Sequence, residues 1–325
     1  MTCMGSRRRF LAALGSAAAT SCAGALRRGT ANNPFHAPQP DSVPAPTPPY
    51  TGWVQDFGFW LNASPDTRPF TTFVTYALDI DEESSANTLQ IDDADARRIV
   101  WFVSLFSYGP TPRSRNGYSL RPDYVAGWNR VKDIIGARLD RTRAIWLMDE
   151  PDSVAWGDKV PGELYTPNLY NDDIVRAAAL MHANFPDVAI GLNYGGVPAD
   201  LTIPSSITLV GLEAYGDRWR SDVAALKRKT GYPIWLLAPG YISGDPDALD
   251  APTAQRVRDQ VAYAHTDPQI RGFYPFLWHE DDTTTSTRDF YTVYPGGRLP
   301  QTTNVLMQVG AAIREGRNRR MPLPG

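Results

Sequence analysis

Short apolar runs rich in β-branched and aromatic residues recur along the chain from Gly52 onward, and amphipathic stretches of helical period separate several of them. This alternation is the pattern of a parallel α/β fold. The apolar runs predict eight strands, over residues 54–61, 72–78, 99–106, 144–148, 188–192, 209–212, 234–237 and 272–277.

Eight parallel strands joined by crossover helices predict a single-domain (β/α)8 TIM barrel. A doubly wound open sheet is the alternative, but it usually carries a Gly-rich phosphate loop after its first strand, and none is present there. Residues 62–70 hold two prolines and no helical period, so the first strand is expected to be irregular. The predicted helices span residues 124–135, 173–184, 219–229 and 253–265, and a closing helix spans residues 304–314.

The first 29 residues have the features of an export signal. Arg7-Arg8-Arg9 precede Phe10-Leu11 and a weakly apolar run of small residues, which resembles the bacterial twin-arginine signal. This resemblance implies that the Tat translocase exports the protein. The apolar run is too short to span a bilayer permanently, so we expect the leader to be cleaved.

Two modes of processing fit the end of this leader. Ala19-Thr20-Ser21-Cys22 resembles a lipobox, in which Cys22 would be lipidated and would tether a periplasmic or outer-membrane lipoprotein. Ala23-Gly24-Ala25 is an ordinary small-x-small cleavage site, which would give a secreted protein. The leader (residues 1–29) is followed by a Pro-rich linker (30–50), the barrel domain (51–318) and a tail (319–325).

Charge and cysteine content exclude several kinds of partner. The leader holds five arginines and no acid, so the remaining chain carries 27 basic and 35 acidic side chains. Such a surface does not match phosphate backbones, and we expect no nucleic acid to bind. Cys3 and Cys22 both lie in the leader, so the folded part has neither a disulfide nor a thiolate metal site. No metal or other cofactor is indicated, because the three histidines outside the linker lack ligand spacing.

Carboxylates end two of the predicted strands, on the side where barrels carry their active sites. The fourth strand ends in Asp149-Glu150-Pro151 and the sixth in Glu213-Ala214-Tyr215. Glycosidic cleavage needs one protonated carboxylic acid and one ionised carboxylate, so Glu150 and Glu213 are the predicted catalytic pair, in either order of roles. Asp149 would raise the pKa of Glu150 by like-charge repulsion and is the third predicted catalytic residue.

Polar and aromatic residues at other strand ends are predicted to bind substrate. Sugars stack on tryptophan rings, although a tryptophan after the eighth strand also fits a core position at the end of the barrel. The predicted substrate-binding residues are Tyr215, Trp278, His279, Asn193, Tyr194 and Asp79.

Three motifs resemble the barrel-type glycoside hydrolases, especially clan A, whose fourth strand carries Asn-Glu-Pro. They are Asp149-Glu150-Pro151, Glu213-Ala214-Tyr215-Gly216 and Phe276-Leu277-Trp278, within a similar layout over residues 52–282. The resemblance implies that Glu150 is the acid/base. Two departures are that Asp149 replaces the clan's Asn and that residues 235–240 lack its strand-seven nucleophilic Glu. Barrel hydrolases with carboxylates on strands four and six, or with a strand-four Asp-x-Glu and a strand-six tyrosine that use the substrate's acetamido group, fit as well.

These features predict an exported glycoside hydrolase that acts on a polysaccharide or glycan. The alternative is a non-catalytic carbohydrate-binding or cell-surface barrel that has lost its nucleophile, because Ala238-Pro239 follow the seventh strand. A barrel lyase or a metal-dependent hydrolase is a third possibility, against which the shortage of histidines counts.

Overall fold

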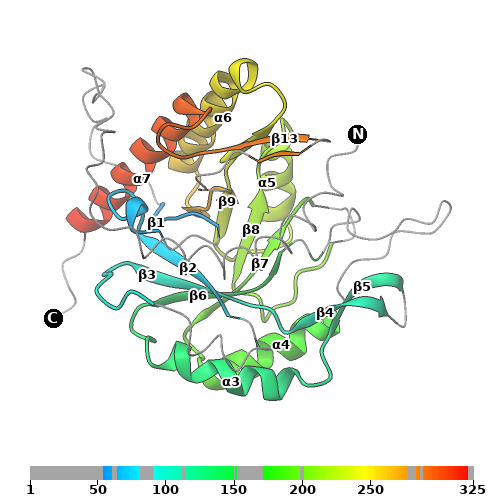
Figure 1. Ribbon diagram of the computed structural model, residues 1–325. Helices are drawn as coiled ribbons and strands as arrows, with labels where there is room; N and C mark the ends of the chain where they lie inside the picture. Colours follow the sequence, from blue (N-terminus) through cyan, green and yellow to red (C-terminus); the bar gives the residue numbers. More distant parts are fainter. Residues whose placement is uncertain are drawn as a thin grey trace.

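The computed structural model describes residues 54–60, 64–78, 80, 91–111, 114–149, 151, 171–197, 201–276, 278, 283–285 and 288–320. Helices surround one central sheet of strands (Figure 1). The leader, the linker and residues 321–325 lie outside the described residues.

Eight parallel strands form the central sheet, in the order β1-β11-β9-β8-β7-β6-β3-β2. The first and last strands of this order also meet, because Thr72 N donates to Phe57 O at 2.7 Å and Phe57 N donates to Thr72 Oγ1 at 2.8 Å. The sheet is therefore a nearly closed barrel, and the predicted TIM-barrel fold is confirmed. Its strands are β1 (Asp56–Phe57), β2 (Phe73–Leu78), β3 (Arg98–Val103), β6 (Thr142–Asp149), β7 (Ala189–Tyr194), β8 (Leu209–Glu213), β9 (Ile234–Leu237) and β11 (Ile270–Phe273).

The first strand is short and irregular, as the sequence predicts. Only Asp56 and Phe57 pair regularly with β11, although hydrogen bonds from Gln55 N to Arg271 O and from Trp60 N to Pro275 O continue the contact at either end. The predicted strand over residues 54–61 therefore lies at the right place in the barrel but is mostly irregular backbone.

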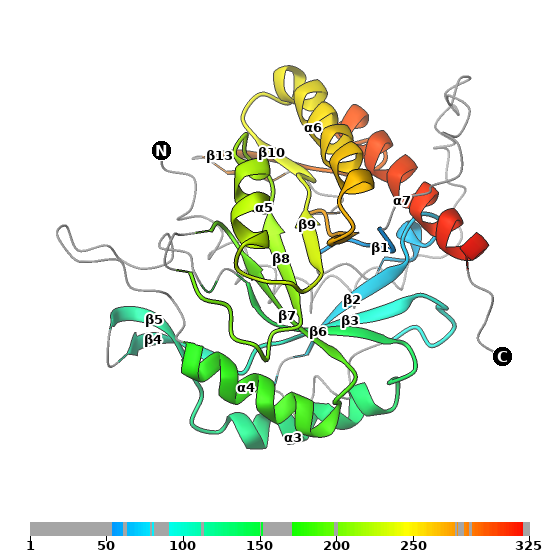
Figure 2. The same cartoon turned by 180° about the vertical axis from the view of Figure 1, so that it is seen from behind.

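Five α-helices lie outside the barrel in the described part of the chain. α3 (Tyr124–Gly136) and α4 (Asn171–Asn184) cover one side, whereas α5 (Trp219–Lys227), α6 (Pro246–Thr266) and α7 (Pro300–Arg320) cover the other (Figures 1 and 2). None of the described helices combines the length and the apolarity needed to cross a bilayer.

Three of these helices begin earlier than the sequence predicts, and α4 does so by only two residues. α6 starts at Pro246 rather than near residue 253, because the Asp245 side chain accepts a hydrogen bond from Asp247 N and Pro246 occupies the first turn. Pro252 lies inside the helix and obscured this start. α7 spans Pro300–Arg320, so it extends beyond the predicted residues 304–314 at both ends.

Smaller elements that the sequence did not predict extend the barrel. β4 (Phe106–Thr111) and β5 (Ser114–Leu120) form a hairpin after β3. β10 (Tyr241–Ser243), β12 (Thr283–Thr285) and β13 (Arg288–Thr292) form a separate antiparallel sheet. Gly240 N donates to Phe276 O and Val293 N to Gly240 O, which joins this sheet to the barrel rim.

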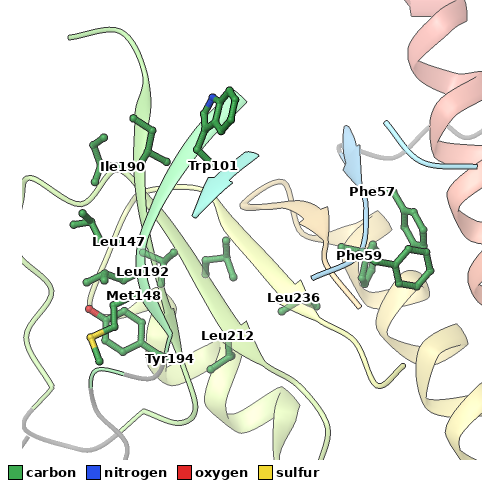
Figure 3. Packing of buried hydrophobic residues seen from close by; sticks show 14 of the residues in the cluster. Phe57, Phe59, Trp101, Leu147, Met148, Ile190, Leu192, Tyr194, Leu212 and Leu236 are labelled. Atoms are coloured by element: carbon green, nitrogen blue, oxygen red, sulfur yellow. The ribbon is translucent and has the colours of Figure 1, made fainter. Parts of the chain in front are cut away.

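The apolar core has two parts. The larger part fills the layer between the strands and the helices, where Figure 3 shows Leu147, Ile190 and Leu192 packed together. The smaller part contains residues from strands and their extensions and none from a helix, which identifies it as the barrel interior. Its buried members are Trp60, Phe73, Val100, Ala144, Trp146, Leu209, Trp235, Leu237, Tyr274 and Phe276.

Glycines on neighbouring strands make room for the large rings of the barrel interior. A Cβ added at Gly191 or Gly211 would lie 2.7 or 2.9 Å from the Trp146 ring, and one added at Gly272 would lie 2.7 Å from the Trp235 ring. Trp146 also stacks on Tyr274, with ring centroids 5.6 Å apart and planes 7° apart. Large aromatic side chains thus fill the barrel interior. We call the C-terminal end of the barrel strands the opening.

Gly272→Ala is expected to lower the free energy of unfolding by about 1–3 kcal/mol, because the added methyl group overpacks a rigid ring rather than a flexible side-chain end. Gly231→Ala is the matched control, since nothing lies within 4 Å of a Cβ added there. Urea denaturation of both variants measures the difference, and equal stabilities would contradict this packing.

A buried ion pair near the start of β3 ties two loops together. Arg97 donates to Asp95 Oδ2 at 2.8 Å and to the hydroxyls of Thr67, in η2 (Pro65–Thr67), and Thr71. Burial acts to raise the pKa of Asp95, but the hydrogen bonds and charge of Arg97 outweigh it, and the pKa is lowered overall.

Acid titration is expected to expose the contribution of Asp95 to stability. The folded-state pKa lies below the unfolded value of about 3.9, so the stabilisation is fully present above that pH and is lost as the pH falls through the folded pKa. Asp95→Asn should flatten the pH dependence of the free energy of unfolding below about pH 4. Urea titrations in that range measure it, with the exposed Asp93→Asn as the control; identical slopes for the two variants would refute it.

Candidate active site

The alternation of residues along β8 places Glu213 on the inner side of the barrel. Leu209 belongs to the barrel interior and Gly211 lies against Trp146, so alternate residues of this strand face inward. Glu213 continues this inward series at the C-terminal end of β8 and is partly exposed. Tyr215 continues it further and packs on the interior cluster.

An irregularity in β6 turns Asp149 inward as well. Trp146 faces the interior and pairs with Gly191, but the next matched pairs are Met148 with Leu192 and Asp149 with Asn193. Met148 belongs to the outer core, as does the residue before it (Figure 3). The extra residue therefore shifts the alternation, and Asp149 joins the inward-facing series.

Asp149 and Asn193 are held together at this end of the barrel. Asn193 Nδ2 donates to Asp149 Oδ1 at 2.6 Å, and the Asn193 side chain is completely buried. Burial, and after it the Asp149 carboxylate, raise the pKa of Tyr274 well above its ordinary value, against an opposing effect of Thr75. The Tyr274 hydroxyl therefore stays protonated at neutral pH.

The pairing of β6, β7 and β8 gives the relative positions of Asp149 and Glu213 along the barrel. Asp149 pairs with Asn193, and Asn193 pairs with Gly211, so Asp149 and Gly211 are level and two strands apart, or roughly 10 Å. Glu213 lies two residues further along β8, or roughly 7 Å. Both residues belong to the inward-facing series of their strands and lie at the C-terminal end of the barrel.

The end of β9 contributes apolar groups to this opening. Leu237 pairs with Glu213, faces inward and is buried, and Ala238-Pro239 follow it. Pro239 bridges to Phe276 of the neighbouring segment, so this part of the wall is fixed. The strand-seven position where clan A carries its nucleophile thus holds no acid, as the sequence indicates.

Aromatic rings border the opening beside Glu213. The Tyr215 and Tyr241 ring centroids lie 5.2 Å apart, and those of Tyr241 and Phe276 lie 5.5 Å apart, with near-perpendicular planes in both pairs. Tyr215 and Tyr241 are partly exposed. Partly exposed aromatic rings can pack against the C–H face of a sugar.

Two predicted substrate-binding residues lie in the core instead, and those predictions are corrected. Tyr194 is 2% exposed and faces the outer layer with Met148 and Leu192 (Figure 3), because the inward position of β7 belongs to Asn193. Trp278 is 3% exposed, and its ring centroid lies 5.2 Å from those of both Phe59 and Phe70. Neither ring is available for stacking on a sugar.

The remaining predicted residues divide into two groups. Glu150, Asp79, His279 and Cys22 lie outside the described residues, so their roles stay predictions. Within the described residues, Asp149, Glu213 and Tyr215 come together at one end of the barrel, with Asn193 beneath Asp149.

Sequence reasoning missed Tyr241 and Tyr274. Tyr241 follows a Pro-Gly pair, which indicated a turn and not a wall of the site. Tyr274 lies inside an apolar run, where a tyrosine gives no signal until the inward-facing series is known. Among the residues that the structure describes, no three His, Cys, Asp or Glu side chains gather as metal ligands would.

The sequence matches no family model, and no curated protein matches it. Among solved structures, the chain is similar to a psychrophilic glycoside hydrolase family 10 endo-β-1,4-xylanase, with 14% identity, a TM-score of 0.47, and coverage of 78% of this chain and 96% of that one. It is also similar to a GH113 β-1,4-mannanase, with 12% identity, a TM-score of 0.47, and coverage of 79% and 98%.

A β-glucuronidase from an uncultured Clostridium species has 11% identity and a TM-score of 0.43, over 68% of this chain. The match spans 43% of that enzyme and 40% of a second β-glucuronidase, from Dictyoglomus thermophilum. The barrel fold is shown by the strand pairings themselves, and these likenesses say nothing of this chain's substrate.

Proposed function

We propose that this protein is an exported glycoside hydrolase that cleaves glycosidic bonds in a polysaccharide or glycan at the C-terminal end of the barrel. The observation that supports the proposal is the placement of Asp149 and Glu213 at the C-terminal ends of β6 and β8, two strands separated only by β7. Export is proposed from the leader, in which Arg7-Arg8-Arg9 precede an apolar run and Cys22 offers a site of lipidation.

The proposed reaction divides the acid and base roles between two strands. Glu150, which directly follows Asp149, protonates the leaving oxygen, and Glu213 attacks the anomeric carbon or activates water; the opposite assignment follows the same chemistry. The ionised Asp149 next to Glu150 raises the pKa of the acid, which keeps it protonated near neutral pH. Tyr215 and Tyr241 orient the sugar beside Glu213.

A second candidate function is non-catalytic carbohydrate binding, and the end of β9 favours it. The inward residue there is Leu237, and it is followed by Ala238-Pro239 rather than by an acid. The same opening with its aromatic border would then hold a glycan without cleaving it.

One experiment separates the two functions. The purified protein is incubated with a panel of neutral, amino and acidic glycans, while bound glycan and newly formed reducing ends are measured on the same samples. Hydrolysis predicts reducing ends that increase linearly with enzyme concentration. Binding of a glycan without release of reducing ends favours the second function, and neither binding nor release would refute both.

A further inference from the structure

Asn193 occupies a closed position beneath the proposed site. Its side chain is 0% exposed, its Nδ2 donates to Asp149 Oδ1 at 2.6 Å, and its Oδ1 has no hydrogen-bond partner. A substrate in the opening cannot reach a side chain that is completely covered. The predicted role of Asn193 in binding substrate is therefore corrected.

Gly211 makes this position possible. It pairs with Asn193 across the sheet, and a Cβ at residue 211 would lie 2.6 Å from Asn193 Oδ1 and 2.9 Å from the Trp146 ring. Any side chain on Gly211 would therefore push the asparagine amide away from Asp149. The structure thus contains a space shaped for this one hydrogen bond.

The hydrogen bond from Asn193 Nδ2 favours the ionised form of the Asp149 carboxyl group. An amide N–H that donates to a carboxylate stabilises the ionised form and fixes its orientation. Among the described residues, the other titratable side chains at this end of the barrel are Tyr274, which stays neutral, Glu213, Tyr215 and Tyr241. An ionised Glu213 would oppose a second negative charge on Asp149 by like-charge repulsion, and the Asn193 amide favours that charge.

We propose that Asn193 is a positioning residue, which keeps Asp149 as an ionised carboxylate in one orientation at the barrel opening. This inference rests on the proposed hydrolase function for its purpose: a fixed negative charge beside Glu150 keeps that acid protonated. Asn193 acts only through Asp149 and touches no substrate. Gly211 contributes to the same arrangement, because the absence of a side chain there leaves room for the Asn193 amide.

Two readouts test the role of Asn193, one of which does not depend on activity. Carboxyl ¹³C NMR titration follows Asp149 in the wild type, in Asn193→Ala and in the isosteric Asn193→Asp. We expect Asp149 to titrate at higher pH in Asn193→Ala, since the donor is lost, and higher still in Asn193→Asp, since a second carboxylate takes its place. Asn184→Ala, whose exposed amide bonds only to Leu180 O, is the control.

Kinetics on a hydrolysed glycan give the second readout. We expect kcat to fall roughly 10- to 100-fold in Asn193→Ala, with KM changed less than about threefold and the acidic limb of the pH profile moved upward. A folded Asn193→Ala protein in which Asp149 titrates as in the wild type would overturn the proposal. If no glycan is cleaved, the hydrolase function fails, but the NMR titration still decides whether Asn193 holds Asp149 ionised.

Discussion

Glu213→Gln is expected to lower kcat on the cleaved glycan by roughly 10³-fold or more, because it removes a carboxylate that must carry charge or move a proton in the reaction. Glutamine has nearly the same shape, and Glu213 lies at a partly exposed strand end. The free energy of unfolding should therefore change by less than about 1 kcal/mol. Initial rates of reducing-end formation, together with urea denaturation, measure both quantities.

Two comparisons make this test specific. Glu315→Gln replaces an exposed glutamate on α7, far from the strand ends, and should leave kcat unchanged. Glu213→Ala should regain part of its rate when azide is added if Glu213 is the attacking group, since a small anion can take its place at the anomeric carbon. A Glu213→Gln variant with kcat within twofold of the wild type would remove Glu213 from the mechanism.

Arg143→Met is expected to have the largest effect on stability, a loss of about 3 kcal/mol in the free energy of unfolding. Arg143, on β6, donates to both carboxylate oxygens of Asp56, on β1, across the end of the barrel opposite the proposed site. The Asp56 side chain is 1% exposed, and the Arg143 guanidinium also lies 5.6 Å from the centre of the Trp235 ring. The variant removes a cationic partner from a buried carboxylate.

A double variant separates the ion pair from packing. Asp56→Asn combined with Arg143→Met removes both charges, and it should be more stable than Arg143→Met alone, because no buried charge remains uncompensated. Thermal and urea denaturation of the three proteins give the coupling between the two residues. Equal losses in the single and the double variant would assign the effect to packing over Trp235 instead.

The barrel was predictable because its strands are short apolar runs in a regular order. All eight predicted strands overlap strands of the sheet. Residues 72–78 overlap β2, for example, and residues 234–237 overlap β9. The hairpin of β4 and β5 was not predictable, because Tyr108-Gly109-Pro110 has the composition of a turn, whereas Tyr108 and Gly109 pair with Tyr118 and Gly117 of β5. Strand length and composition are local properties, whereas such pairing is not.

The site was only partly predictable, for a related reason. In a barrel both faces of a strand are buried, so an apolar run does not show which residues face inward. Leu147 and Met148 both face the helices, and the irregularity between them and Trp146 is what turns Asp149 inward. Likewise, Tyr194 and Asn193 are adjacent in sequence, but only the register shows that the asparagine is the inward residue.

In the proposed reaction, carboxylates at the ends of β6 and β8 cleave glycosidic bonds. The most direct measurement compares the wild type with the Glu150→Gln/Glu213→Gln double variant, on the glycan that the wild type binds most tightly, by the rate of reducing-end formation at saturating substrate. We predict that the double variant still binds the glycan but releases no reducing ends above the uncatalysed background. Equal rates for the two proteins would contradict the claim.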